Sequence, residues 1–202
     1  MGESKGLVRQ YILDTNIFRY LTSSNVDAEL NIATKLFWHK TKSEIENGEA
    51  VLLVPKEVIR ELDVQSYKLK PKENEKIMKL LSLCRVVSPT VSDEDIEHQI
   101  RMLSSHVRSN FKHDIGRPME YGGVSDSRIL YTSYCEDAVL VTANTKDFLL
   151  YALLNPQNEE CLYDIKGERY VEIPKAAYEK IHADPHFQEL LQEFYRLYQE
   201  SD

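Results

Sequence analysis

The chain has 202 residues, of which 42% are hydrophobic, and its 33 acidic and 25 basic side chains give a formal net charge of −8. This length suits one domain with an insertion, and the negative charge argues against a protein that coats nucleic acid non-specifically. No apolar run approaches the roughly 18 to 20 residues that span a membrane, and the polar N-terminus lacks the apolar core of a signal peptide. The three cysteines form no zinc or CxxC pattern, which favours a reduced cytoplasm.

Strands and helices are predicted to alternate from the N-terminus onward. The stretch 11–13 is a short apolar run that ends at Asp14, and a helical pattern with Asn16 placed to cap it follows at once. A long helix is predicted over 27–47, and the apolar run 50–54 predicts a second buried strand.

The middle of the chain is more polar. Pro55 suits the start of a helix over 56–67, which carries Glu61. A short strand is predicted at 86–87, and a helix over 92–109 is expected to open with a capping box.

The last third returns to strong apolar runs. Glycine and proline predict a loop over 111–124, after which Ser125 is expected to cap a helix that starts at Asp126. The run 138–142 predicts a third buried strand, and a helix is expected over 145–154.

The C-terminal part is expected to complete an α/β fold. A hairpin is predicted over 161–173, followed by two helices that Pro174 and Pro185 open. Strands that alternate with helices imply a mostly parallel central sheet covered on both faces.

Four acidic residues fall at comparable places in this pattern. Asp14 ends the first strand, Glu61 lies on the helix after the second, Asp126 opens a helix and Asp147 follows the strand 138–142. Each one alone is most simply a solvated helix terminus. Because parallel strands end at one edge of a sheet, the four are expected to converge there. Oxygen ligands without a paired Cys or His favour Mg²⁺ or Mn²⁺, which would relieve the repulsion among the carboxylates.

Four short blocks of the chain resemble, in order, the motifs of PIN domains: LDTN (13–16), VIREL (58–62), SDSRIL (125–130) and VTANTKDF (141–148). The resemblance implies a Rossmann-like α/β/α sandwich and an endoribonuclease that hydrolyses RNA phosphodiester bonds with water activated at a Mg²⁺ or Mn²⁺ carboxylate cluster. Asp14, Glu61 and Asp126 would then be catalytic metal ligands.

The fourth position of the implied site departs from the family pattern. The position often held by Asp falls on Asn144, with Asp147 three residues later, and either residue would complete the site. Asn16 and Thr142 are expected to support the ligands through hydrogen bonds.

The chain is also longer than the small toxin-type members of the family. We expect a single PIN-like domain over 1–202, with a helical insertion at 66–120 and a helical extension at 174–202. These additions argue against a minimal toxin.

Basic residues suggest where RNA, expected to be single-stranded, would lie. Lys68, Lys70, Lys72 and Arg128 are the candidates, although interleaved acids make the lysine-rich stretch an ordinary solvated helix face as well. Two alternative functions stay open: a toxin-like ribonuclease with an antitoxin partner, and a non-catalytic RNA-binding protein. A second copy of the chain, in a homo-oligomer, is a further candidate partner. An aspartyl phosphatase is disfavoured, because Asn16 stands where such enzymes usually carry a second Asp.

Overall fold

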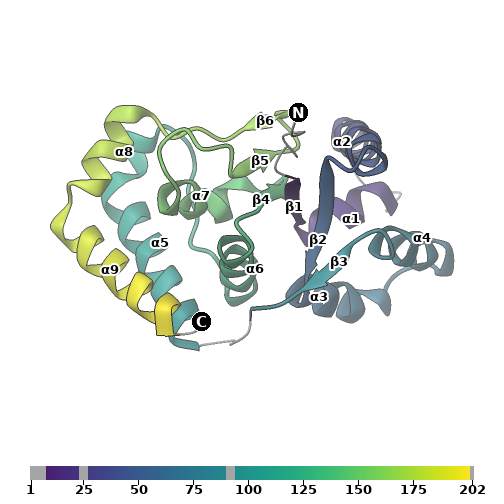
Figure 1. Ribbon diagram of the computed structural model, residues 1–202, viewed down its shortest axis with the longest axis horizontal. Helices are drawn as coiled ribbons and strands as arrows, with labels where there is room; N and C mark the ends of the chain where they lie inside the picture. The colour runs from purple at the N-terminus through teal and green to yellow at the C-terminus, as the bar shows by residue number, and fades with distance from the viewer. Residues whose placement is uncertain (1–7, 23–26, 90–93, 201–202) are drawn as a thin grey trace, which may run out of the picture.

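The computed structural model describes residues 8–22, 27–89 and 94–200, which form an α/β fold around one sheet (Figure 1). The six strands of the sheet are β1 (Arg9–Leu13), β2 (Ala50–Pro55), β3 (Arg85–Val87), β4 (Val139–Thr142), β5 (Leu162–Asp164) and β6 (Arg169–Tyr170). They are ordered β3-β2-β1-β4-β5-β6, and all neighbours are parallel except β5 and β6. The predicted mostly parallel sheet and the hairpin at 161–173 are confirmed.

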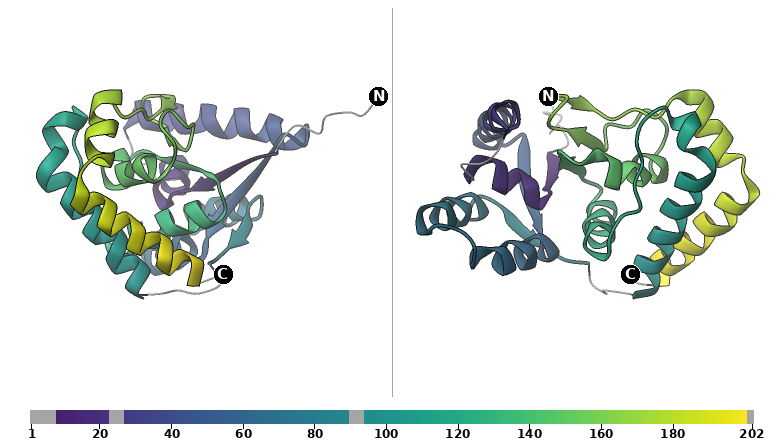
Figure 2. Two further views of the ribbon diagram at one scale, coloured as in Figure 1. Left: turned by 60° about the vertical axis from the view of Figure 1, so that its left-hand side comes forward. Right: turned by 180° about the vertical axis from the view of Figure 1, so that it is seen from behind.

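Helices cover both faces of this sheet. Those of the described residues are α1 (Thr15–Thr22), α2 (Ala28–Glu46), α3 (Lys56–Ser66), α4 (Pro71–Leu81), α5 (Glu94–Ile115), α6 (Val124–Cys135), α7 (Thr145–Leu154), α8 (Lys175–His182) and α9 (Pro185–Glu200). Figures 1 and 2 show α1, α2 and α4 on one side of the sheet and α6 and α7 on the other, with α5, α8 and α9 as an outer layer. Within the described residues, no helix is both long and apolar enough to cross a membrane.

The apolar runs of the sequence form the centre of the core. Ile12 and Leu13 of β1, Leu53 of β2 and Leu140 of β4 are fully buried. β1 pairs with β2 on one side and with β4 on the other, and the chain reaches these neighbours through helices on opposite faces. In an open α/β sheet such a reversal leaves a crevice at the carboxyl ends of the strands.

The middle of the chain differs from its prediction at two points. α5 continues to Ile115, because Phe111 and Ile115 prolong the buried face of Val107, and Gly116 with φ +70° ends it. The loop is therefore shorter than 111–124. The stretch 66–120, expected to be a helical insertion, also contains β3, the short strand predicted at 86–87, which pairs with β2 in the central sheet.

The predicted start of α5 lies outside the described residues, since Ser92 belongs to the segment 90–93. The C-terminal helices α8 and α9 pack against α5. The outer layer thus joins α5 to residues 174–200.

Candidate active site

Asp14 lies directly after β1 and is 5% exposed. Its backbone N–H donates to the carbonyl of Val141 at 3.1 Å, which places it over the neighbouring end of β4. Its Oδ2 accepts hydrogen bonds from Thr142 Oγ1 at 2.8 Å and from Asn16 Nδ2 at 3.3 Å. The two residues expected to support the site thus contact Asp14 directly. Asn16 does not cap the helix, because α1 already begins at Thr15.

Burial and neighbouring charges make Asp14 a weaker acid than usual. Burial, followed by repulsion from Asp126 and Glu61, raises the pKa of Asp14 to about 6, although the hydrogen bond from Thr142 opposes the change. Three carboxylates from distant parts of the sequence therefore interact electrostatically at the carboxyl edge of the sheet.

Glu61 and Asp126 each accept a hydrogen bond that orients the carboxylate. Thr15 Oγ1, beside Asp14, donates to Glu61 Oε2. Asp126 is in the first turn of α6, where its Oδ2 accepts from the backbone N–H of Gly123 at 2.8 Å. The predicted cap at Ser125 is wrong, because α6 begins at Val124 and the Ser125 hydroxyl donates to Glu57 instead.

Asp147 and Asn144 occupy the fourth position expected at this edge of the sheet. Asn144 Nδ2 donates to Asp147 Oδ2 in the first turn of α7, while the Asn144 backbone N–H donates to Thr142 Oγ1 at 2.9 Å. Burial, followed by repulsion from Asp126, raises the pKa of Asp147, and Lys146 opposes this. A Cβ at Gly122 would lie 3.4 Å from the carbonyl oxygen of Asp147, so this loop passes close to α7.

We call Asp14, Glu61, Asp126 and Asp147 the acidic site. Over the described ranges, no three His, Cys, Asp or Glu side chains are arranged so that they alone could hold a metal ion. The donor set is nevertheless all oxygen, and the mutual repulsion is of the kind that a cation relieves. Mg²⁺ commonly binds through one or two carboxylates, several waters and substrate phosphates, so it needs no complete cage of side chains.

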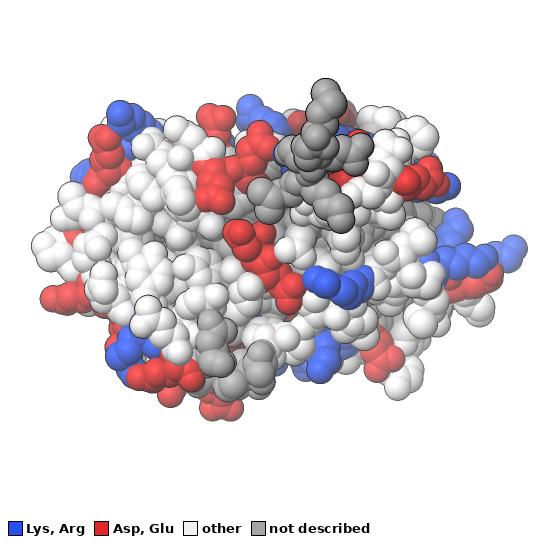
Figure 3. Space-filling view, in the orientation of Figure 1, with Lys and Arg blue, Asp and Glu red and all other residues white. Residues whose placement is uncertain are grey.

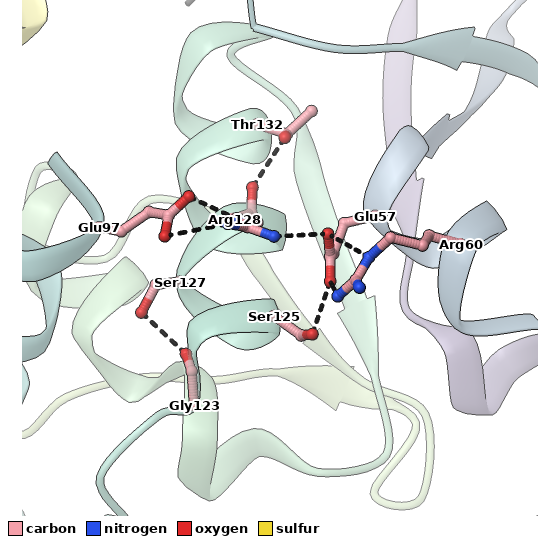
Figure 4. A network of polar contacts seen from close by, with 8 residues as sticks. All are labelled: Glu57, Arg60, Glu97, Gly123, Ser125, Ser127, Arg128 and Thr132. Carbon is pink, nitrogen blue, oxygen red and sulfur yellow. Dashed lines mark hydrogen bonds and ion pairs between the residues drawn. The ribbon is translucent and has the colours of Figure 1, made fainter. Parts of the chain in front are cut away.

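Beside the acidic site lies an ion-pair network that sequence reasoning missed. Figure 4 shows Arg128 of α6 between Glu97 of α5 and Glu57 of α3. Its Nε is 2.5 Å from Glu97 Oε1 and its Nη1 is 3.3 Å from Glu57 Oε2. Both glutamates are 8% exposed. We call Glu57, Glu97 and Arg128 the arginine clamp.

The clamp is held by further donors to Glu57. Arg60 Nη2 lies 2.5 Å and Ser125 Oγ 2.6 Å from Glu57 Oε1. Burial favours the neutral acid, but the hydrogen bonds from Arg60, Ser125 and Arg128 outweigh it and leave the pKa of Glu57 below its usual value. Glu57 lies one turn before Glu61, so the clamp braces the helices that carry Glu61 and Asp126.

The predicted RNA-binding residues do not form one surface. Lys68 and Lys70 lie between α3 and α4, and Lys72 is in the first turn of α4, all three exposed. Figure 3 shows Lys and Arg side chains over α4, at the right-hand side of the view. Arg128 is instead engaged by the two carboxylates of the clamp, so a phosphate would have to compete with them.

The comparisons with known proteins leave the function open. No protein-family model and no curated protein matches the chain. A solved structure that matches is the crystal structure of VapBC2 from Rickettsia felis bound to a DNA fragment from their promoter. The two sequences are 21% identical, and the match covers 70% of this chain and 92% of the other, with a TM-score of 0.44.

Proposed function

We propose that the chain is a PIN-type endoribonuclease that requires Mg²⁺ or Mn²⁺ and hydrolyses single-stranded RNA. The observation that carries the proposal is the buried carboxylate of Asp14, whose pKa is raised to about 6 by burial and by Asp126 and Glu61 at the carboxyl edge of the sheet. A buried acid with repelling neighbours in a crevice is typical of a functional site. The four PIN-like sequence blocks supply the reaction class.

The oxygen donors of the acidic site suit a hard divalent cation. Asp14, Glu61 and Asp126 would hold it, with Asn144 or Asp147 as the fourth contributor. Such a cation polarises the phosphodiester group and lowers the pKa of a water molecule, which supplies the nucleophile for hydrolysis.

The remaining residues orient the carboxylates. Thr142 and Asn16 fix Asp14 through hydrogen bonds to the same oxygen, Oδ2. Thr15 fixes Glu61, and the backbone N–H of Gly123 fixes Asp126. Preorganised contacts of this kind spare the site rearrangement when substrate binds.

A second candidate function is RNA binding without cleavage. It is favoured by Asn144 at the fourth position and by the lack, within the described residues, of three side chains that could hold a metal by themselves. An antitoxin partner or a second copy of the chain are further proposals, which co-purification and light scattering would test. A cytoplasmic location is proposed because Cys84, Cys135 and Cys161 form no zinc or CxxC pattern in the sequence.

The deciding experiment incubates the purified protein with single-stranded RNA in Mg²⁺, in Mn²⁺ and in excess chelator. We expect cleavage with either metal, none in chelator, and losses of about 100-fold or more in Asp14→Asn and Asp126→Asn. Cleavage that survives the chelator would contradict a metal-dependent mechanism. RNA binding without cleavage in any metal would support the second candidate.

A further inference from the structure

A basic hollow adjoins the acidic site at the carboxyl ends of β4 and β5. It has a volume of about 450 Å³, and Asn144 lines it. Three cationic side chains enter it from separate elements: Arg117 follows α5, Lys146 is in the first turn of α7, and Arg169 is on β6. These residues are far apart in sequence, and the sheet edge brings them together. The hollow therefore starts where Asn144 contacts Asp147 and extends toward the β5–β6 hairpin.

The charges of this hollow are available to an anion. Neither Arg117 nor Arg169 forms a salt bridge with any residue that the structure describes. Lys146 lies 3.9 Å from Glu120, but both side chains are about half exposed, and such pairs contribute little to stability. Asp164 is the acid that lines the hollow. Its Oδ1 accepts a hydrogen bond from the backbone N–H of Lys166 at 3.0 Å, which helps to close the hairpin turn.

The start of α7 adds to the positive potential. Its N-cap, Asn144, makes no side-chain hydrogen bond to the backbone of the first turn, and its amide donates to the side chain of Asp147 instead. The free N–H groups and the dipole of a helix N-terminus favour negative charge. This contribution is secondary to that of the three cationic side chains.

A second hollow on the other side of Arg117 and Arg169 has the opposite character. It is lined by Glu159, Glu160 and Glu172 together with the two arginines. The arginines thus separate an acid-rich surface from the hollow beside Asn144. A polyanion would be directed toward the end of β4, where the acidic site lies.

We propose that the basic hollow binds backbone phosphates of the RNA next to the bond that is cleaved. Its lining contains no aromatic side chain, so it offers no platform on which a base would stack. Contacts to phosphates alone position a strand without selecting its sequence. The proposal rests on the proposed function for the identity of the ligand, and it places the substrate track at 117, 146 and 169 rather than at Lys68, Lys70 and Lys72.

The test measures binding of a labelled single-stranded RNA in chelator, where cleavage does not occur, at several salt concentrations. Arg117→Gln with Arg169→Gln is compared with the control Lys68→Gln with Lys70→Gln, which also removes two positive charges. We expect the first pair to weaken binding at least about 10-fold and to reduce the salt slope by about 1.4, since each of the two lost phosphate contacts in a single strand contributes about 0.7. The control pair should bind like wild type.

Cleavage kinetics distinguish RNA binding at the basic hollow from catalysis at the acidic site. The double variant Arg117→Gln with Arg169→Gln should have a higher KM and a largely unchanged kcat. Asp14→Asn should abolish turnover and keep RNA binding. If the double variant melts early, Lys146→Gln provides a second variant, with a smaller loss of affinity expected. Wild-type affinity and slope in both hollow variants, a larger loss in the lysine control, or no RNA binding by wild type would each overturn the proposal. A protein that binds through the hollow but never cleaves would contradict only the nuclease function.

Discussion

At the scale of single residues, the ionisation of Asp14 opposes folding. Its pKa is about 6 in the folded chain against 3.8 for the free side chain. A group whose pKa is raised on folding contributes most below the unfolded pKa, and this contribution is lost as the pH rises through the folded value. Without a cation, the protein should therefore lose stability between about pH 4 and pH 7, by up to about 3 kcal/mol if the full shift is realised.

Asp14→Asn tests this dependence directly. The amide removes the charge, so melting temperatures in chelator should fall less steeply between pH 4 and pH 7 than those of wild type. Thr142 and Asn16 both donate to the same oxygen, Oδ2, and an Asn carbonyl oxygen with its two lone pairs can accept both hydrogen bonds, so the variant should keep the local geometry. Parallel pH profiles for the two proteins would show that Asp14 is not the residue responsible.

Asp147 should matter less to the reaction than Asp14. It is partly exposed and bonded to Asn144, whereas Asp14 is buried among the other acids. We expect Asp147→Asn to lower kcat/KM by about 10- to 100-fold, the range for residues that support a metal ligand, and Asp14→Asn to lower it further. Equal losses at saturating Mg²⁺ would instead make Asp147 a direct ligand.

At the scale of elements, the arginine clamp joins α3, α5 and α6. Removing one member of a buried ion pair leaves its partner unpaired, which typically costs 3–5 kcal/mol. Because the side chain of Arg128 is 35% exposed, we expect Arg128→Met to cost about 2–3 kcal/mol in urea unfolding. Arg128→Lys should recover little, since an ammonium group lacks the planar fork that reaches both glutamates.

A double-mutant cycle distinguishes a network from separate contacts. Glu97→Gln with Arg128→Met should be less destabilised than the sum of the two single variants, because the second change removes a charge that the first left unpaired. Additive losses would mean that Glu97 and Arg128 do not stabilise each other.

The elements differ in how well the sequence predicts them. The strands β1, β2 and β4 and the helix α7 follow from apolar runs with clear boundaries, and parallel pairing then places Asp14 and Asp147 at one edge. The cap at Asn16 is mispredicted because α1 begins one residue earlier, and the cap at Ser125 because the fold brings Glu57 to its hydroxyl. The clamp and the basic hollow need residues from three elements each, so no local pattern indicates them.

At the scale of the whole molecule, metal binding should be visible as stability. A ligand that binds only the folded state raises its stability by mass action, so Mg²⁺ should raise the melting temperature of wild type. Asp126→Asn removes one of the repelling charges and can keep the hydrogen bond from Gly123, so in chelator it should melt at or above wild type.

With saturating Mg²⁺ the difference in melting temperature between Asp126→Asn and wild type should shrink or reverse, because the variant binds the cation less tightly. The measurement is a pair of thermal melts on both proteins, with and without metal. A wild type that Mg²⁺ does not stabilise, together with a variant less stable in chelator, would sink the metal-site hypothesis.

The pairing of β1 with β4 also decides when during synthesis the site comes into being. Thr142 lies 128 residues after Asp14, and both the strand that carries it and the helix that carries Asp126 are needed to assemble the acidic site. At translation rates of about 5–20 residues per second, the interval between these residues is on the order of ten seconds. During that time the emerging chain would hold Asp14, and later Glu61, without Asp126 and Asp147. If the chain is the nuclease proposed above, its acidic site would stay incomplete until more than two thirds of the chain has been made.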